Sequence, residues 1–255
     1  MIKIEHLNVQ YGGKDKKFTA IDDINLDIAK GEICSIIGPS GGGKSTLLKV
    51  LAGIIKDYKG QILIEGENIN PKIHRIGFIP QNYGLVEWKT VEENILLSAK
   101  IKYGKRNIDK EYYEEILNKL KIDNLKNRYP KELSGGQKQR VSIARAFLLK
   151  PNLLLMDESF SALDAMTREK VQELFLEVWR EHKVTTVLIT HDIKEAIYLG
   201  EKLVVFSSSP GRIIKIIRNP LFGESDSESS EDFRKLSNEL IRILKEVNTN
   251  EIKGI

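Results

Sequence analysis

The stretch Gly38-Pro39-Ser40-Gly41-Gly42-Gly43-Lys44-Ser45-Thr46 fits the pattern G-x-x-x-x-G-K-[ST], in which x is any residue. The apolar run before it, 33–37, predicts a buried strand, and the run 44–52 predicts the start of a helix. Strand, loop and helix in this order form a phosphate-binding loop, because backbone N–H groups turn towards phosphate oxygens at the positive end of the helix. We expect Lys44 to reach the β- and γ-phosphates of a nucleotide and the Ser45 hydroxyl to bind Mg²⁺.

The composition is typical of an ordinary globular protein. The 255 residues are 41% apolar and 30% charged, and 40 Lys and Arg against 36 Asp and Glu leave a net charge of only +4. Because the charges are interspersed, we expect no nucleic-acid partner. The chain has no apolar run of about 18 residues and no signal-peptide pattern at its start. The single cysteine, Cys34, lies in an apolar run and is expected to be a buried structural thiol. Together these features favour a cytoplasmic protein.

The first part of the chain indicates a β-rich segment ahead of an α/β core. Residues 2–9 and 24–28 alternate between apolar and polar, as half-buried strands do. Tyr11 stands beside a glycine turn between them. Its ring could stack on an adenine base or cover the edge of a sheet, because both uses need the same apolar face.

The middle of the chain changes from strands to helices. After the short strands predicted at 61–64 and 76–79, Thr90 and Glu93 form a capping-box pattern at the start of a helix. Apolar residues at helical spacing predict a second helix over 109–120. We interpret residues 82–150 as a helical subdomain inserted into the α/β core.

A second glycine turn, Leu133-Ser134-Gly135-Gly136-Gln137, precedes another predicted helix. Free N–H groups at a helix N-terminus can bind an anion. The turn can equally be an ordinary helix start in which Ser134 is the N-cap, and on its own this second interpretation is favoured.

Carboxylates and a histidine follow two predicted core strands. The apolar run 153–156 predicts a strand buried on both faces, and it ends in Asp157 and Glu158. Asp157 fits an acid that holds Mg²⁺, and Glu158 fits a general base that accepts a proton from the attacking water. His191 follows the predicted strand 185–189, so we expect it at the same sheet edge, where an imidazole could bond a γ-phosphate oxygen.

With these landmarks the chain resembles the ATP-binding subunit of an ABC transporter over residues 1–220. Gly38–Thr46 resembles Walker A, 153–158 resembles Walker B with the catalytic glutamate, and 133–137 is identical to the signature LSGGQ. Gln81 stands at the position of the Q-loop glutamine, 161–164 at the D-loop, and His191 at the switch histidine. Tyr11 matches the adenine-stacking aromatic. The resemblance implies a phosphate-loop NTPase core, with a mostly parallel sheet flanked by helices, an N-terminal antiparallel β-subdomain and a helical insertion that carries LSGGQ.

The resemblance also implies a head-to-tail dimer with ATP between the two copies. The residues that it assigns to ATP in the chain's own loop are Tyr11, Gly38, Pro39, Ser40, Gly41, Gly42, Gly43, Lys44, Ser45 and Thr46. Those assigned to the partner copy's ATP are Ser134, Gly135, Gly136, Gln137 and Asp164. Ser45, Gln81 and Asp157 would bind Mg²⁺, and Glu158, His191 and Gln81 would be catalytic.

Finer features are similar to the nitrate, sulfonate and taurine branch of importers. They are the runs 161–168, 209–213 and 85–91, although that branch usually has Pro-Trp in the last of these. Ser159 stands where the family usually has proline, and Gly200 where alanine is common. The implied partners are a second copy or a homologous ATPase subunit, permease subunits contacted through about Tyr83–Asn94, and indirectly an extracytoplasmic solute-binding protein. The implied location is the cytoplasmic face of the membrane, as a peripheral protein.

The alternative function is that of a soluble ABC-superfamily ATPase not coupled to transport. Chromosome-associated members have a long coiled coil between the Walker motifs, and translation-associated members have tandem cassettes. Residues 45–153 contain no sustained heptads, and only one phosphate loop occurs. Beyond residue 220 we predict an acidic, serine-rich connector over 221–232, then an amphipathic helix and tail over 233–255 that folds back on the core or on a partner.

Overall fold

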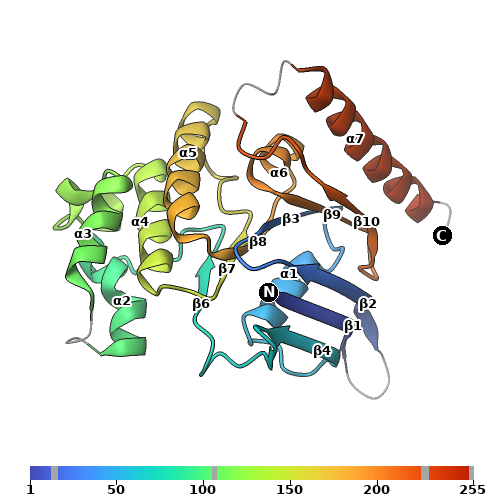
Figure 1. Ribbon diagram of the computed structural model, residues 1–255, viewed down its shortest axis with the longest axis horizontal. Helices are drawn as coiled ribbons and strands as arrows, with labels where there is room; N and C mark the ends of the chain where they lie inside the picture. The colour runs from blue at the N-terminus through green and yellow to red at the C-terminus, as the bar shows by residue number, and fades with distance from the viewer. Residues whose placement is uncertain (13–16, 105–107, 225–229, 253–255) are drawn as a thin grey trace. The chain divides into compact units, whose positions relative to one another are not determined.

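The computed structural model describes residues 1–12, 17–104, 108–224 and 230–252. The chain forms two compact units: Met1–Pro71 with Thr185–Ile255 (unit 1), and Lys72–Val184 (unit 2) (Figure 1). The predicted helical subdomain, 82–150, lies within unit 2. Residues 225–229 of the predicted acidic connector lie outside the described residues.

Unit 1 begins with an antiparallel sheet in the order β2-β1-β4-β5. Its strands are β1 (Ile2–Tyr11), β2 (Phe18–Ile28), β4 (Lys59–Ile64) and β5 (Glu67–Asn68). The β-rich start is therefore confirmed. However, β2 begins well before residue 24, because its first residues pair with the far end of β1, Phe18 opposite Tyr11. The alternation puts Ile24 and Leu26 in the core.

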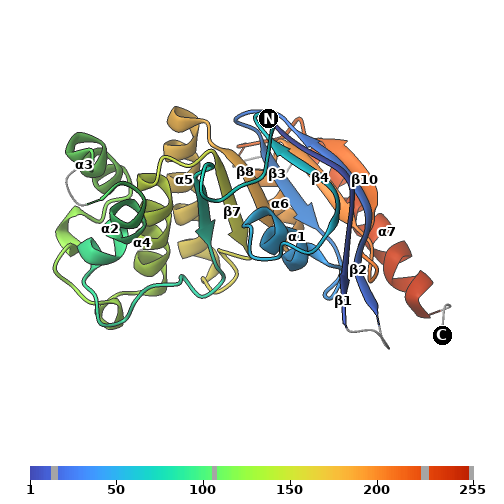
Figure 2. The ribbon, with the colours of Figure 1, turned by 90° about the horizontal axis from the view of Figure 1, so that it is seen from below.

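The second sheet of unit 1 is built around β3 (Ile33–Ile37), which is buried along its whole length. β3 pairs in parallel with β8 (Thr185–Ile189) on one side and β9 (Lys202–Phe206) on the other. β10 (Ile213–Arg218) pairs antiparallel with β9. The helix α1 (Lys44–Leu51) packs against β2 and β8 (Figure 2), and α6 (Ile193–Leu199) packs against β3.

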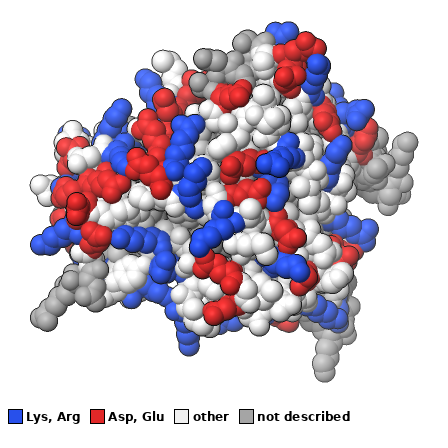
Figure 3. Space-filling view, in the orientation of Figure 1, with Lys and Arg blue, Asp and Glu red and all other residues white. Residues whose placement is uncertain are grey.

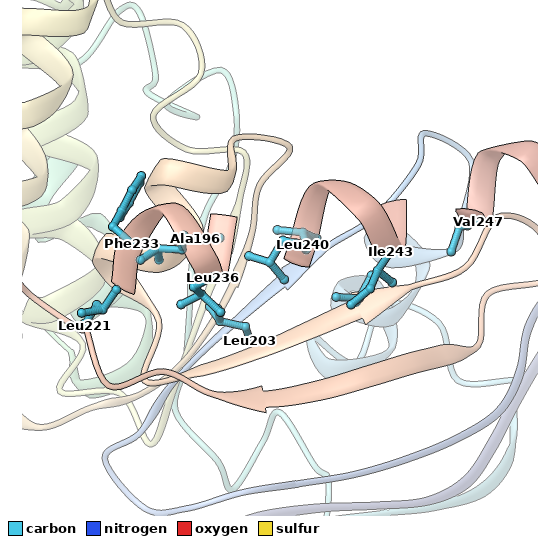
Figure 4. Close-up of a cluster of buried hydrophobic side chains, with 11 residues drawn as sticks. Ala196, Leu203, Leu221, Phe233, Leu236, Leu240, Ile243 and Val247 are labelled. Atoms are coloured by element: carbon cyan, nitrogen blue, oxygen red, sulfur yellow. The ribbon is translucent and has the colours of Figure 1, made fainter. Parts of the chain in front are cut away.

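The C-terminal helix α7 (Glu231–Ile252) packs against unit 1 through one apolar face. The buried side chains on this face follow helical spacing: Phe233, Leu236, Leu240, Ile243 and Val247 (Figure 4). They contact a cluster from α6 and β9 that includes Ala196 and Leu203. Of the two alternatives left open by the sequence, packing on the protein's own core is therefore the one observed.

The described residues of unit 2 form a pair of parallel strands and four α-helices. The strands are β6 (Ile76–Ile79) and β7 (Leu153–Asp157), and they pair in register, Ile79 opposite Met156. The helices are α2 (Val91–Tyr103), α3 (Lys110–Lys119), α4 (Gly135–Leu148) and α5 (Ala165–His182), with short 3₁₀ turns at Asp123–Leu125 and Pro130–Glu132.

The predicted capping box of α2 is present. The Thr90 hydroxyl accepts a hydrogen bond from the Glu93 N–H (3.2 Å), and the Glu93 carboxylate accepts one from the Thr90 N–H (2.9 Å).

The surface carries both charge signs. On the face shown in Figure 3, Lys and Arg side chains are interspersed with Asp and Glu. Among the described residues, no helix is both long enough and apolar enough to cross a bilayer. Cys34 is fully buried, as predicted, and burial raises the pKa of its thiol to about 12.

Candidate nucleotide site

The phosphate loop of unit 1 joins the end of β3 to the start of α1, in the predicted strand–loop–helix context. Two of its glycines are required by close packing on the outside of the loop. A Cβ on Gly42 would lie 2.3 Å from the Ser207 carbonyl oxygen, and one on Gly43 would lie 2.4 Å from that of Ala20. Gly43 also has φ +78°, a conformation that favours glycine. Only glycine therefore fits at positions 42 and 43 as the loop is packed.

Lys44 is nearly buried, with 7% of its surface exposed, and its ammonium group is held by the loop itself. Nζ donates hydrogen bonds to the carbonyls of Gly38 (2.8 Å) and Pro39 (2.5 Å). The loop thus carries a fixed positive charge among its backbone groups, as a phosphate site requires.

The N-terminus of α1 is left without a side-chain cap. Its N-cap residue is Gly43, and the first turn contains no acidic residue. By contrast, α2, α3, α4, α5 and α6 each begin with a side chain that accepts a backbone N–H. The N–H groups and the positive dipole end of α1 are therefore suited to an anion.

Two further predicted residues belong to unit 1. The Tyr11 hydroxyl lies 3.3 Å from the Thr46 hydroxyl, which places the half-exposed ring beside the start of α1. His191 is exposed and follows β8, whose Ile189 pairs with Ile36 of β3. Because these strands are parallel, His191 and the phosphate loop lie at the same edge of the sheet.

The predicted acidic residues lie in unit 2. Asp157 is the last residue of β7, and Glu158 follows with φ +47°, an uncommon conformation for a residue other than glycine. Gln81 Nε2 lies 3.4 Å from Glu158 Oε2 and 3.4 Å from Ser161 Oγ. The Ser161 hydroxyl donates to the Glu158 carbonyl at 2.8 Å. The structure therefore brings the predicted Gln81 and Glu158 together in one hydrogen-bonded group.

The second glycine turn forms an ordinary capped helix start. The Ser134 hydroxyl accepts from the Gln137 N–H (3.3 Å), and the Gln137 side chain accepts from the Ser134 N–H (2.9 Å). Its glycines are close-packed, since a Cβ on Gly136 would lie 2.4 Å from the Thr167 methyl group. Asp164 caps α5 by accepting the Thr167 N–H at 3.0 Å. Hydrogen bonds from the side chain and the backbone of Thr167 lower the pKa of Asp164. The interpretation as an N-cap is thus confirmed, while a role towards a partner's nucleotide stays a prediction.

Two residues of α4 that the sequence analysis did not single out hold the turn after Gln81. The Ser142 hydroxyl donates to the Tyr83 carbonyl at 2.9 Å. The Arg145 guanidinium donates to the same carbonyl at 2.8 Å and also to the Gly84 carbonyl. Tyr83 has φ +64°, so this turn takes up a strained conformation. In the sequence, the only indication of this role was that Ser142 and Arg145 are polar residues within an otherwise apolar part of α4.

The segment 83–94 is held equally firmly at its other end. Asn94 is fully buried, and its amide donates to the carbonyls of Val86 (3.1 Å) and Lys89 (3.1 Å) and accepts the Val86 N–H (2.7 Å). Trp88, between them, is 80% exposed. A large apolar ring is therefore presented to solvent on a well-supported loop.

A glycine-rich loop ahead of an uncapped helix, with a carboxylate pair at the end of a buried strand, defines a phosphate-loop nucleoside triphosphatase. The protein-family model described as "ABC transporter" matches residues 21–161. The aliphatic sulfonates import ATP-binding protein SsuB of Bacillus cereus is 44% identical over 92% of this chain and 93% of its own. The taurine import ATP-binding protein TauB of Shigella boydii is 41% identical over 84% of this chain and 83% of its own.

Among solved structures, the ATP-binding cassette MJ0796 in a dimeric post-hydrolysis state bound to ADP and Pi is 32% identical, with a TM-score of 0.74. The match covers 86% of this chain and 98% of that cassette. The chain belongs to the ABC transporter family and is an ATPase subunit of that family. The alternative of a soluble member not coupled to transport is not favoured, since both relatives are import proteins.

Proposed function

We propose that this chain energises an importer for a small organic solute of the sulfonate or taurine type. The observation that carries the proposal is the similarity to import subunits for these solutes over most of the chain, with every predicted motif intact. Because both named solute classes carry a sulfonate group, the two relatives support a sulfonate-containing solute more than a sugar or peptide. The solute itself would be selected by other subunits, namely a permease and an extracytoplasmic binding protein.

In this proposal, unit 1 binds the nucleotide. Lys44 exchanges its two loop carbonyls for phosphate oxygens, the N–H groups of α1 bind the phosphates, and the ring of Tyr11 stacks on the adenine. Ser45, Asp157 and Gln81 supply the oxygen ligands that Mg²⁺ prefers. Bound Mg²⁺ would neutralise charge that develops on the phosphates.

Hydrolysis is assigned to Glu158 as general base, with Gln81 orienting the water and His191 donating to a phosphate oxygen. Glu158→Gln should keep ATP binding and lower kcat by about 10²–10⁴-fold, because the amide cannot accept the proton. Glu173→Gln, on the exposed side of α5, is the matched control and should behave as wild type. Hydrolysis by Glu158→Gln at the wild-type rate would refute the assignment of the base.

We further propose that the active form is a head-to-tail pair, in which Ser134, Gly135, Gly136, Gln137 and Asp164 of one copy act on the nucleotide of the other. The Ser134 hydroxyl occupies one N–H group at the N-terminus of α4, that of Gln137. The other N–H groups of the first turn can still bind an anion, which supports this role. Ser134→Arg should bind ATP at its own loop but lose hydrolysis.

Complementation distinguishes a shared site from a self-contained one. Ser134→Arg and Lys44→Ala should each be inactive alone, whereas a mixed pair contains one intact site. The mixture should then regain about a quarter of the wild-type turnover if the two sites act independently. A mixture that stays inactive although mixed pairs form would contradict the head-to-tail arrangement.

The permease is proposed to bind at Tyr83–Asn94, so that the chain works as a peripheral protein at the cytoplasmic face of the membrane. The support is the exposed Trp88 on a loop fixed by Asn94 and Arg145. Trp88→Ala should weaken co-purification with the membrane subunits encoded beside this chain. Ile101→Ala, which removes a similarly exposed apolar side chain from α2, should not. Equal recovery of the permease with both variants would move the contact elsewhere.

A further inference from the structure

Ser159 is a buried hydroxyl directly after the proposed general base. Its side chain is fully buried, and Oγ donates a hydrogen bond to the Ile79 carbonyl at 2.9 Å. Ile79 is the last residue of β6, and Ser159 lies just beyond the end of β7. The bond therefore links the carboxyl ends of the two neighbouring parallel strands of unit 2, beyond the last paired residues, Ile79 and Met156.

The two strand ends that this bond joins carry the two groups that are proposed to act on the same water, Gln81 and Glu158. Gln81 follows Ile79 after a single residue, Pro80, whose ring fixes its φ angle. Glu158 immediately precedes Ser159 and is held with φ +47°. Few rotatable bonds thus separate the Ser159–Ile79 hydrogen bond from either side chain.

The contact between Gln81 and Glu158 is sensitive to small movements. Gln81 Nε2 lies 3.4 Å from Glu158 Oε2, just beyond the usual N–H···O range of about 2.7–3.2 Å. A shift of a few tenths of an ångström between the strand ends would therefore make or break it. A proline in place of Ser159, as the family usually has, could not supply the link, because it has no hydroxyl.

We propose that Ser159 is a positioning residue for ATP hydrolysis, whose hydroxyl holds the end of β6 against the turn after β7 and thereby sets Gln81 against Glu158. The inference rests on the proposed roles of Gln81 and Glu158. Ser159 touches no nucleotide in this scheme, and it acts through the geometry of the other two.

The test compares Ser159→Ala with Ser159→Thr in the full chain, at a concentration that allows pairing or with the membrane subunits present. Ser159→Ala should lower kcat about 10- to 100-fold, as expected when catalytic groups are misplaced by a fraction of an ångström. The KM for ATP should change less than about twofold, because the phosphate loop is untouched. Ser159→Thr keeps the donor and should recover most of the turnover.

A double-mutant cycle with Gln81→Ala separates positioning from general loss of structure, even if Ser159→Thr folds poorly. If Ser159 acts through Gln81, Ser159→Ala should lower kcat by less than about twofold in the Gln81→Ala background. Losses that multiply, or wild-type turnover by Ser159→Ala, would overturn the inference. If Gln81→Ala and Glu158→Gln both hydrolyse ATP normally, it is instead the proposed function of these residues that fails.

Discussion

Removal of the Arg145 side chain is the sharpest test of how α4 supports the catalytic segment. Arg145 donates charge-assisted hydrogen bonds to the carbonyls of Tyr83 and Gly84, and partial burial lowers the pKa of its guanidinium. We therefore expect Arg145→Ala to destabilise unit 2 and to loosen the turn that follows Gln81.

The magnitude follows from the bonds that are lost. Two hydrogen bonds from a charged donor are together worth about 3–6 kcal/mol. Water can reach the exposed Gly84, and Ser142 still donates to the Tyr83 carbonyl, so we expect a net loss of about 2–3 kcal/mol. For a chain of this size that corresponds to a fall in Tm of about 5–10 °C.

The assay is thermal unfolding by circular dichroism, with ATP turnover measured on the same samples. Arg145→Lys keeps the charge but not the two-pronged geometry, so its Tm should fall between the wild type and Arg145→Ala. Arg242→Ala, at a 72% exposed side chain of α7, is the matched control and should melt with the wild type. If Arg145→Ala melted within about 1 °C of the wild type, the reasoning that these bonds stabilise the turn would be wrong.

Three further predictions concern other parts of the chain. Gly200→Ala would put a Cβ 2.5 Å from the Ser35 hydroxyl, so it should destabilise the protein by about 1–3 kcal/mol in urea unfolding. Ser35→Gly should reduce that cost. An unchanged urea midpoint for Gly200→Ala would contradict the close packing. Desolvation lowers the pKa of His182, so the unfolded chain binds the proton more readily than the folded chain. The free energy of unfolding should therefore fall as the pH drops below about 6.5. Between pH 7.5 and 5.5, Tm should fall less in His182→Asn than in the wild type. With a thiol pKa of about 12, Cys34 has a thiolate fraction of about 10⁻⁴ at pH 8, so iodoacetamide should label the unfolded chain but not the native one, and rapid native labelling would show that the thiol is accessible.

Local sequence patterns predicted much of the secondary structure because their causes are local. The Thr90 capping box, the apolar run 33–37 and the helical spacing of α7 each depend on residues within a few positions of one another. The context of the phosphate loop was predictable for the same reason. What local patterns could not determine was which of two interpretations held at Ser134, since a cap and an anion site share one sequence.

Contacts between residues distant in sequence were not predictable in this way. Ser159 and Gly200 could be recognised only as departures from a family pattern, and the structure supplies the physical account. The Ser159 hydroxyl bonds Ile79, and Gly200 accommodates the side chain of Ser35, whose hydroxyl has no described hydrogen-bond partner. Arg145 likewise gave no signal of its target. The roles of the site residues towards ATP stay predictions that the variants above test.

If the uncapped N-terminus of α1 binds nucleotide as proposed, the stability of this protein would depend on the nucleotide concentration in the cell. A ligand that binds only the folded chain stabilises it by about 2.7 kcal/mol at a concentration of 100 times Kd. Unit 1 would thus be most resistant to proteolysis when nucleotide is abundant, and the starved cell would lose this subunit by degradation sooner than it loses proteins whose helices all cap themselves. The absence of a side-chain cap at Gly43 would in this way couple the lifetime of the subunit to the supply of ATP.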